Sequence, residues 1–506
     1  MVNKIDSNVT GLAIAEETTP GVLPGSPVWY EAEPNSYQEF GGQIETVARD
    51  TLNATRQRLK GSTTDLNVSA GFNTDLTQHN LTRIQQGFVF ADAHEKPDTA
   101  SFNSTAITIS AVDGTNDQFE AASGLDAFLS GSLVFSQGFT NTINNGLHVV
   151  DGVAAGAIDV TTNLVTETPP AGARVQAVGF QFASADAVMT VSGGVATLSC
   201  TAADFTDMGL TIGEWVWLGG DDSGDAFATC PRGFARIETI AATALRFDKV
   251  TSAFVSDTGT GKTLQMFFGK FLRNEPDADD IVTRSYQLER TLGRDANGVQ
   301  SQYIEAAFCN TLTLNIPTAN KATVDLGFVG LDDVYRDGTT GVKSGDRVAA
   351  LGEDAFNTSS KVYRLRMNII DPATLQPTAL FGYVTDANIT ISNNVSAIKA
   401  VGNLGGIDVS VGNFDVGGTI TALFTEISAC DAIRNNPDVT FDVILAQENA
   451  GLIYDIPLTA LGNGRLDVVK DQPIKLPISM LAAKGAAGYT LGIVNFPYLP
   501  DAAMPS

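Results

Sequence analysis

Residues 7–36 read SNVTGLAIAEETTPGVLPGSPVWYEAEPNS, and residues 41–70 read GGQIETVARDTLNATRQRLKGSTTDLNVSA. No enzyme motif accounts for either stretch. Their distinctive features are two proline-containing runs, a basic segment and a Gly-Ser turn, found at Glu17 to Pro20, Pro27 to Trp29, Arg49, Arg56 and Arg58, and Gly61-Ser62.

The order of these features resembles the N-terminus of bacteriophage tail tube proteins, specifically the major tail tube proteins of siphophage type. In that family a lead of the form "G…A.E.TPG..P..P.W" is followed by a strand with arginines, a Gly-Ser turn, a second strand and a helix. The resemblance is clearest over the N-terminal 90 residues, moderate over residues 282–330, and limited to pattern over the final 150. It implies a β-sandwich whose sheets join across subunits into rings, and rings that stack by loops into a hollow tube for the genome.

Composition sets broad limits on the protein. A chain of 506 residues is too long for one compact core and suggests roughly three or four domains. Its net charge of −26 disfavours direct binding to nucleic acid or to an anionic membrane. In a tube, such acidity would keep passing DNA from sticking, although the sequence does not say which carboxylates face the lumen.

The cysteines and the N-terminus exclude several classes. Cys200, Cys230, Cys309 and Cys430 are widely spaced, without a CxxC pair, so we expect buried free thiols, with Cys200 and Cys230 the one plausible bridge. Neither a signal-peptide core nor a run of about 20 apolar residues is present, so we expect a protein assembled in the host cytoplasm, without membrane contact.

Period-two alternation of apolar residues dominates the chain and predicts a mainly β protein. It occurs at Leu66 to Phe72, Leu312 to Ile316, Ala322 to Phe328, Ile407 to Val411, Phe441 to Leu445 and Ile474 to Ile478. One helix is predicted after the possible cap Asn73-Thr74, with Leu81, Ile84 and Phe88 on one face and Gly87 at its end. A second short helix is expected in SACDAIRNN, residues 428–436.

The middle of the chain differs in charge from the rest. Residues 97–231 contain one basic residue, Arg174, against 15 Asp and Glu. Within this region ITIS, GSLVF, GFTN and GARVQAVGFQF, starting at residue 107, are echoed by MTVS, GEWVW, GFAR and GKTLQMFFGKF, starting at residue 189. These echoes predict tandem all-β modules at 100–184 and 185–267. The first resembles the small modules that decorate phage tail proteins, through "F..G..V…GFTN..NNG".

A fainter duplication divides the remainder of the chain. The order of strand, Gly turn, strand and helix in residues 41–92 recurs in residues 384–446, and residues 303–330 parallel residues 452–481. We therefore expect a split first tail tube module, 1–96 plus 268–335, and a second tube-like module, 355–506, each a β-sandwich with a short helix. Residues 336–354, with the Gly-rich and Ser-rich GTTGVKSGD, form the predicted exposed linker. The inserted modules would point outward, because so large an insert does not fit a lumen.

Two motifs suggest ligand sites but fit them poorly. TGTGKT (258–263) lacks the first P-loop glycine, since Ser256 stands there, and a strand pattern follows it, so a hairpin turn is the better interpretation. DDSGD (221–225) departs from a calcium loop at Ala226 and Arg232 and is better explained as a solvated acidic turn. We predict no cofactor and no metal.

Catalytic residues are equally hard to place. His79 is expected on the first helix and His148 on a strand, and each is more often structural than catalytic, as is His94. Carboxylates are too abundant for one pair to stand out. Trp215 and Trp217 share a strand face and, with Phe135 and Phe139, could bind glycans weakly, but core packing is favoured.

The feature that stands out is a basic cluster, Arg49, Arg56, Arg58 and Lys60, in an otherwise acidic chain. It could be a solvated strand face. Given the family resemblance, we favour a subunit boundary, where guanidinium groups form bidentate pairs with carboxylates of the next copy.

The predicted function is therefore a non-enzymatic virion protein that forms the phage tail tube. Its partners would be other copies of itself, as a trimer with pseudo-sixfold symmetry or a hexamer, together with tail terminator, tape measure and distal tail proteins, and passing DNA that is not tightly bound. One alternative is an extracellular β-rich adhesin or surface-layer protein, which the missing signal peptide disfavours. Another is a glycan-degrading tail enzyme, which no residue pattern in the sequence indicates.

Overall fold

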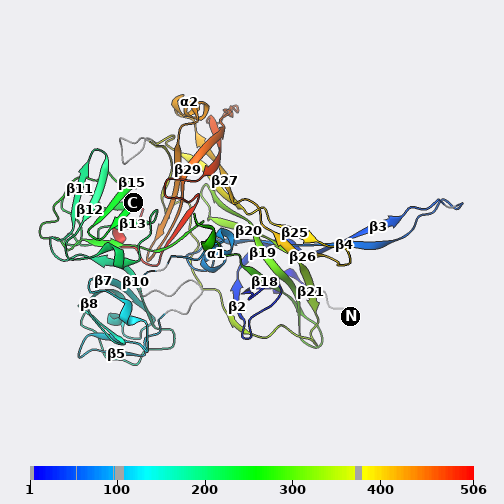
Figure 1. Ribbon diagram of the computed structural model, residues 1–506, viewed down its shortest axis with the longest axis horizontal. Helices are drawn as coiled ribbons and strands as arrows, with labels where there is room; N and C mark the ends of the chain where they lie inside the picture. Colours follow the sequence, from blue (N-terminus) through cyan, green and yellow to red (C-terminus); the bar gives the residue numbers. More distant parts are fainter. Residues whose placement is uncertain (1–4, 53, 95, 97–106, 371–378, 506) are drawn as a thin grey trace. The chain divides into compact units, whose positions relative to one another are not determined.

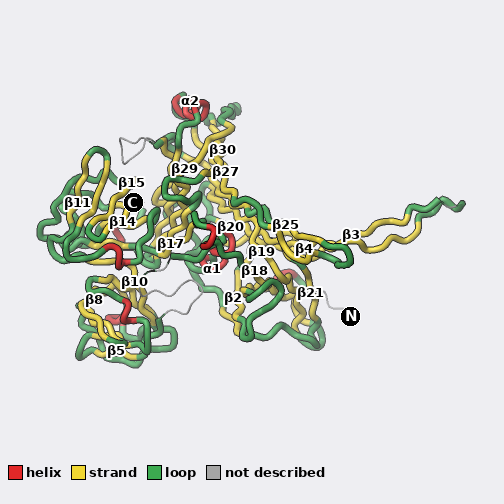
Figure 2. Tube along the Cα trace, viewed as in Figure 1, coloured by secondary structure: helices red, strands yellow, loops and turns green. Residues whose placement is uncertain are grey.

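The computed structural model describes residues 5–52, 54–94, 96, 107–370 and 379–505. They are mainly β, as the sequence predicts (Figure 2). They fall into two compact units. Unit 1 comprises Met1–Phe90, Ile281–Thr358 and Thr385–Thr421, and unit 2 comprises Ala91–Asp280, Ser359–Val384 and Ala422–Ser506. The predicted boundary between residues 96 and 100 lies mostly outside the described residues.

Unit 1 contains one α-helix and a set of strands from three parts of the chain (Figure 1). Its elements are β1 Gly11–Glu16, β2 Val28–Ala32, β3 Pro34–Arg49, β4 Leu59–Asp75, α1 Thr82–Val89, β18 Ser285–Arg294, β19 Val299–Pro317, β20 Thr323–Gly330, β21 Asp332–Arg336, β22 Asp346–Val348, β24 Val384–Ser392, β25 Ser396–Lys399, β26 Gly406–Ser410 and most of β27 Asp415–Leu423.

The central sheet of unit 1 runs in the order β3, β4, β20, β19, β24, all antiparallel. One face is apolar and buried, as the alternation predicts: Leu66, Val68, Ala70 and Phe72 in β4, Val324, Leu326 and Phe328 in β20, and Leu312, Leu314 and Ile316 in β19. The expected alternation at Ile407 to Val411 does not give a buried face, because β25 and β26 form a two-stranded ribbon that leaves Ile407 50% exposed.

The opposite face of this sheet is polar and cross-linked by side chains. Asp325 of β20 accepts hydrogen bonds from Gln38 Nε2 (3.0 Å), Asn73 Nδ2 (2.9 Å) and Asn315 Nδ2 (2.6 Å), which lie on β3, β4 and β19. Thr313 and Thr390 continue the row at 3.3 Å across to β24. These bonds add cross-strand links to a surface that small polar residues dominate.

The helix α1 begins later than the sequence predicts. Asn73 and Thr74 do not cap it, because β4 continues through them to Asp75 and pairs there with β20. Gly87 lies inside the helix, and a Cβ there would meet the Tyr286 hydroxyl at 2.5 Å, so glycine permits close packing on the sheet. The helix ends at Phe90, which has a left-handed φ of 54°.

The predicted linker is exposed over much of its length but anchored to unit 1. Lys343 Nζ lies 2.5 Å from Glu305 Oε1, and Arg347 Nη2 lies 2.6 Å from Glu289 Oε2. The Trp29 indole donates to the Ser344 carbonyl at 3.1 Å, and β22 pairs in parallel with β2. This segment is thus held against the unit by charged pairs and by a short strand.

Unit 2 contains the second α-helix, which matches the expected SACDAIRNN segment, and two sets of strands. Its elements are β5 Ala111–Asp113, β6 Gln118–Glu120, β7 Ser132–Gln137, β8 Gly146–Ala154, β9 Ala157–Val160, β10 Arg174–Gln181, β11 Val188–Ser192, β12 Val195–Ser199, β13 Trp215–Leu218, β14 Gly233–Ala241, β15 Ala244–Val250, β16 Gln265–Phe267, β17 Lys270–Arg273, β23 Val362–Ile369, α2 Ser428–Asn435, β28 Val439–Gln447, β29 Ala450–Asn463, β30 Lys475–Ala483 and β31 Gly492–Phe496.

Strands β5 to β16 form one 12-stranded sheet with a repeated pairing pattern. β7 pairs with β8 and with β10, and β13 pairs with β14 and with β16. Two of the four echoed pairs fall on matching strands: GSLVF and GEWVW on β7 and β13, and GARVQAVGFQF and GKTLQMFFGKF on β10 and β16. ITIS and GFTN lie outside the named strands, whereas their echoes MTVS and GFAR lie in β11 and β14. The repeats are joined by pairing of β10 with β16, from Gly179 opposite Phe267 to Gln181 opposite Gln265.

A shared aromatic core joins this 12-stranded sheet to β28, β29 and β31. Trp215 and Trp217 are 0% and 1% exposed, which confirms the predicted core packing and leaves neither ring to bind a glycan. They pack in one cluster with Ile444 of β28 and Val494 of β31. The 12-stranded sheet therefore buries large side chains against β28, β29 and β31.

A buried ionic network crosses the same contact. Asp442 Oδ1 of β28 lies 2.5 Å from Lys249 Nζ of β15, and its Oδ2 lies 2.7 Å from Arg364 Nε of β23. Arg236 of β14 forms a bidentate pair with Asp248 at 2.8 Å and reaches Asp455 of β29 at 3.0 Å. Although burial alone would raise the pKa of Asp442, Lys249 and then Arg364 bring it below its usual range.

We predict that Asp442→Asn lowers the free energy of unfolding of unit 2 by about 3–5 kcal/mol, because Lys249 and Arg364 keep buried charges without their carboxylate. Glu238→Gln is the control, since its pair with Arg246 is exposed and is expected to change stability by less than about 1 kcal/mol. Urea unfolding followed by tryptophan fluorescence measures both. Equal effects of the variants would contradict the structural importance of the network.

His148 lies on β8, as predicted, and is buried among hydroxyl groups. Its Nε2 lies 2.9 Å from Ser136 Oγ and its Nδ1 lies 2.9 Å from Thr162 Oγ1. Burial lowers the pKa of His148 to about 4, so the folded protein holds a neutral imidazole at neutral pH.

Because the unfolded chain binds this proton near pH 6.5, we predict that His148 makes the β7–β8 region less stable as the pH falls from about 6.5 to 4, by about 3 kcal/mol in total. In His148→Gln this component should disappear, although other groups still titrate. Hydrogen exchange of β7 and β8 at pH 7 and pH 4.5, corrected for intrinsic rates, measures the difference. An identical pH dependence in both proteins would refute the assignment.

Candidate subunit interface

The most conspicuous surface of unit 1 is the β3–β4 hairpin, which Figure 1 shows extending away from strands β18 to β20. Residues 68–75 of β4 pair with β20, whereas among the described strands residues 59–67 pair only with β3. This outer part exposes apolar side chains, including Val47 (59% exposed) and Leu52 (107%). A lone two-stranded ribbon is marginally stable in water, so this hairpin is suited to binding another surface.

The predicted basic residues gather at the tip of this hairpin. Arg49 ends β3, Lys60 is the second residue of β4, and Arg56 and Arg58 lie in the connecting loop. All four are exposed, and none forms an ion pair with a described residue. The structure thus brings the four cations together at one projecting end, where carboxylates of another molecule could reach them.

A second candidate interface is a strand pairing that occurs inside unit 1. The C-terminal half of β19 pairs with β20 on one edge and with β24 on the other, from Thr311 opposite Ser392 to Pro317 opposite Asp386. β24 comes from a distant part of the sequence. Its other side carries the β27 contacts, in which Asn388 Nδ2 donates to Thr419 Oγ1 at 2.9 Å.

In unit 2 one edge of the C-terminal part of β29 has no strand partner, although the Leu461 amide there donates to Asn436 Oδ1 at 3.2 Å. β29 pairs with β28 and β31 along its first half and with β30 from Leu458 to Asn463. Within the described part of the chain, residues 460–463 have β30 as their only strand partner. In unit 1, β3 likewise pairs only with β4 among the described strands. Open strand edges offer backbone donors and acceptors to another chain.

The two ligand motifs form local structure. TGTGKT is a turn in which Gly259 and Gly261 have φ of 62° and 72°, and no helix follows it. The DDSGD turn is bound from within, since Arg232 Nε donates to the Gly220 carbonyl at 2.7 Å and its Nη2 to those of Asp221 and Asp222. Among the described residues, no group of three or more potential metal ligands lies together.

The remaining singled-out residues occupy structural positions. His79 is not on α1 but in the turn before it, where its Nδ1 lies 2.5 Å from Glu353 Oε1. His94 Nε2 lies 2.6 Å from Glu275 Oε1. Cys200, Cys230 and Cys309 are buried free thiols, as expected, and Cys430 is half-buried and free. Within the described residues, no helix has the length and apolar character that a membrane crossing needs.

A β-rich chain with open strand edges and a projecting basic hairpin has the features of a structural protein that binds other chains through its sheets. The phage tail tube protein family matches residues 7–214 and 245–487. Because these segments cover most of the 506 residues, the chain belongs to the phage tail tube protein family and is a structural component of the virion tail. No curated protein matches the sequence.

Sequence reasoning located the basic cluster but not the strand edges. The pairing of β19 with β24 joins residues about 75 positions apart, and no local pattern identifies which edge of a strand is occupied. A signal was present in the parallel between residues 303–330 and 452–481, since these segments fall on the hairpins β19–β20 and β29–β30.

We predict that replacing Arg49, Arg56, Arg58 and Lys60 by Gln leaves the free energy of unfolding within about 1 kcal/mol of the unmodified value, because all four are exposed, but weakens self-association. The residual association should depend less on salt. Light scattering between 50 mM and 500 mM NaCl measures this dependence. The matched control replaces Arg246, Arg294, Lys470 and Lys484, which are also exposed, and the same loss there would point to net charge alone.

Proposed function

We propose that three copies of this chain form a pseudo-sixfold ring, and that rings stack into the hollow tail tube that conducts DNA to the host. Each copy supplies a split first tube module, 1–96 plus 268–335, and a second, 355–506. Polymerisation proceeds in the host cytoplasm. Tail terminator, tape measure and distal tail proteins bind the ends or the lumen of the tube.

The observation that carries this proposal is the pairing of β19 with β24. β24 lies within the proposed second module and pairs with the edge of β19 from the proposed first, and one continuous sheet runs from β3 to β24. A repeated module that joins its neighbour by strand pairing within a chain can join the next chain in the same way. The internal junction is therefore a template for the junction between copies.

The edges of β29 and β3 that lack a strand partner would form the junction between copies. By the proposed duplication, β29 corresponds to β19 and β3 corresponds to β24, and each has one edge without a strand partner in the described chain. Pairing of β29 with β3 of the next copy would close three copies into a ring with no free edge. Closure removes the exposed donors and acceptors that would otherwise promote irregular aggregation.

The polar face of the unit 1 sheet is suited to line the lumen. It carries Asp75, Asp325 and Asp386, and its cations Lys321 and Lys399 are already paired with Asp75 and Asp65. Its other groups are mainly amides and hydroxyls bonded to one another. Such a surface offers DNA phosphates few unpaired donors and a net negative charge, so that DNA passes without tight binding.

The remaining surfaces fit roles outside the lumen. The basic hairpin tip contacts carboxylates of a copy in the adjacent ring, and the modules at 100–184 and 185–267 decorate the exterior. Their burial against β28, β29 and β31 supports a fixed decoration that moves with the tube wall.

Negative-stain electron microscopy of the purified chain at rising concentration tests the proposal. We expect hollow tubes or stacked rings with outer knobs, and threefold class averages of single rings. Solid filaments or sheets without a lumen would overturn the tube, and rings of six chains would overturn the trimer while leaving the tube intact.

We further predict that assembly protects the two open edges from hydrogen exchange. The amides of Leu461 and Gly42 already donate to the side chains of Asn436 and Asp333. In unassembled protein, the other amides of residues 460–463 and of β3 that do not bond β30 or β4 should exchange rapidly, and in the assembled form they should slow by at least about tenfold. The amides of β20, which is paired on both edges in the monomer, serve as an internal reference. Unchanged exchange at β29 and β3 on assembly would contradict ring closure through these strands.

A further inference from the structure

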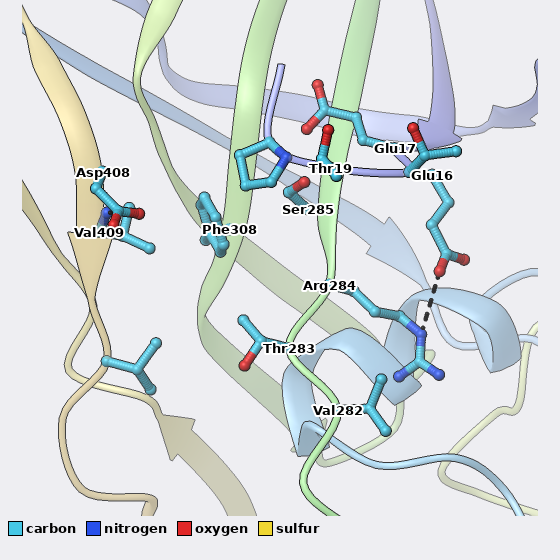
Figure 3. A pocket seen from close by; sticks show the side chains of 13 residues that line it. Glu16, Glu17, Thr19, Val282, Thr283, Arg284, Ser285, Phe308, Asp408 and Val409 are labelled. Atoms are coloured by element: carbon cyan, nitrogen blue, oxygen red, sulfur yellow. Dashed lines mark hydrogen bonds and ion pairs between the residues drawn. The ribbon is translucent and has the colours of Figure 1, made fainter. Parts of the chain in front are cut away.

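Unit 1 contains a pocket of about 510 Å³ that the proposed ring contacts do not use. Figure 3 shows Asp408 and Val409 on one side, the Arg284–Glu16 pair on the opposite side, and Phe308 between them. The turn at residues 16–20 and the segment 282–285 complete it. Val282, Phe308, Val409 and Val411 form the apolar part of a lining that is otherwise largely polar.

The charges around this pocket are mainly acidic. Glu16, Glu17 and Asp408 face one cation, Arg284, whose Nε lies 3.3 Å from Glu16 Oε1. Glu17 is used internally, since it accepts from the Gly21 and Ala306 amides at 2.9 Å and 3.1 Å. Asp408 is exposed, and within the described part of the chain its carboxylate accepts a local bond from the Val409 amide alone. An occupant with one apolar side chain and neighbouring cations would suit both features.

The tip of the β3–β4 hairpin has this composition. Leu52 stands fully exposed between Arg49 and Arg56, and no described apolar residue covers it. A large aliphatic side chain at the end of a projecting hairpin gains free energy only when another surface buries it.

The hairpin of the same chain does not reach this pocket. Phe308 lies opposite Val329, and Val329 lies opposite Ser69 of β4, whereas β4 begins at Leu59. These ten residues of paired strand separate the level of the pocket from the base of the tip by about 33 Å. Because the protruding hairpin and the pocket lie far apart on one molecule, the hairpin of one copy can meet the pocket of the next in a head-to-tail contact.

We propose that this pocket receives Leu52 of a second copy of the chain, while Arg56 or Arg58 of that copy pairs with Asp408. The inference rests on the proposed stacking of rings through the hairpin, and it names the surface that receives the tip. Each ring would then present pockets to one neighbouring ring and tips to the other, which gives the tube its polarity.

Cysteine cross-linking tests the contact in the full chain. With Cys430→Ser as background, Leu52→Cys and Val411→Cys are combined, tubes are assembled, and disulfides are formed with copper phenanthroline. A disulfide requires Cα atoms within about 7 Å, so only direct docking forms it. We expect a ladder of linked dimers, trimers and longer species, at least about tenfold more abundant than with the control pair Leu52→Cys and Val153→Cys, because Val153 is 38% exposed but lies in an inserted module.

Tubes that form normally but link no better than the control pair would overturn the pocket assignment and leave the proposed function standing. Absence of tubes from the unmodified chain would overturn both. As a second measure, Leu52→Asp should raise the concentration needed for tube formation roughly tenfold or more, as loss of one buried leucine implies, while Val153→Asp should not. Equal behaviour of the two variants would also refute the docking.

Discussion

Strand pairing at the edge of β19 is the constraint on which the rest of this structure depends. A β-sheet edge exposes backbone groups that must be paired, covered or left in water. In unit 1 the edge of β19 is taken by β24, so a distant part of the chain completes the sheet. The same kind of edge on β29 and on β3 has no strand partner in the described chain. One chain therefore contains a completed strand junction and two edges without strand partners, and the proposed ring would form by pairing these edges between copies.

Charged side chains are also arranged according to the contacts between strands. The net charge of −26 would make an assembly of many copies repel itself, yet the charges at contacts are locally balanced. In unit 2, Arg236, Lys249 and Arg364 meet Asp248, Asp442 and Asp455 between strands from separate parts of the chain. On the polar face of unit 1, by contrast, the carboxylates accept bonds from amides and hydroxyls, which leaves a surface with weak attraction for phosphate.

The sequence predicts the composition of the elements better than their contacts. Alternation at Leu66 to Phe72 and at Leu312 to Ile316 identifies buried strands, since one face of each packs on the core. The helix start is wrong because pairing of Asn73 and Thr74 with β20 outweighs their preference for a cap. The basic residues of the hairpin tip can be recognised in the sequence, because they cluster in an otherwise acidic chain. The β19–β24 pairing and the pocket cannot be recognised there, because both depend on residues that are distant in sequence and carry no local signal.

A cryo-electron microscopy reconstruction of the assembled tube tests the central claim most directly. The account predicts a ring of three chains in which the density of β29 continues into β3 of the neighbouring copy at the strand spacing of about 4.8 Å. A ring whose copies meet only through side chains, with both strand edges left facing solvent, would contradict it.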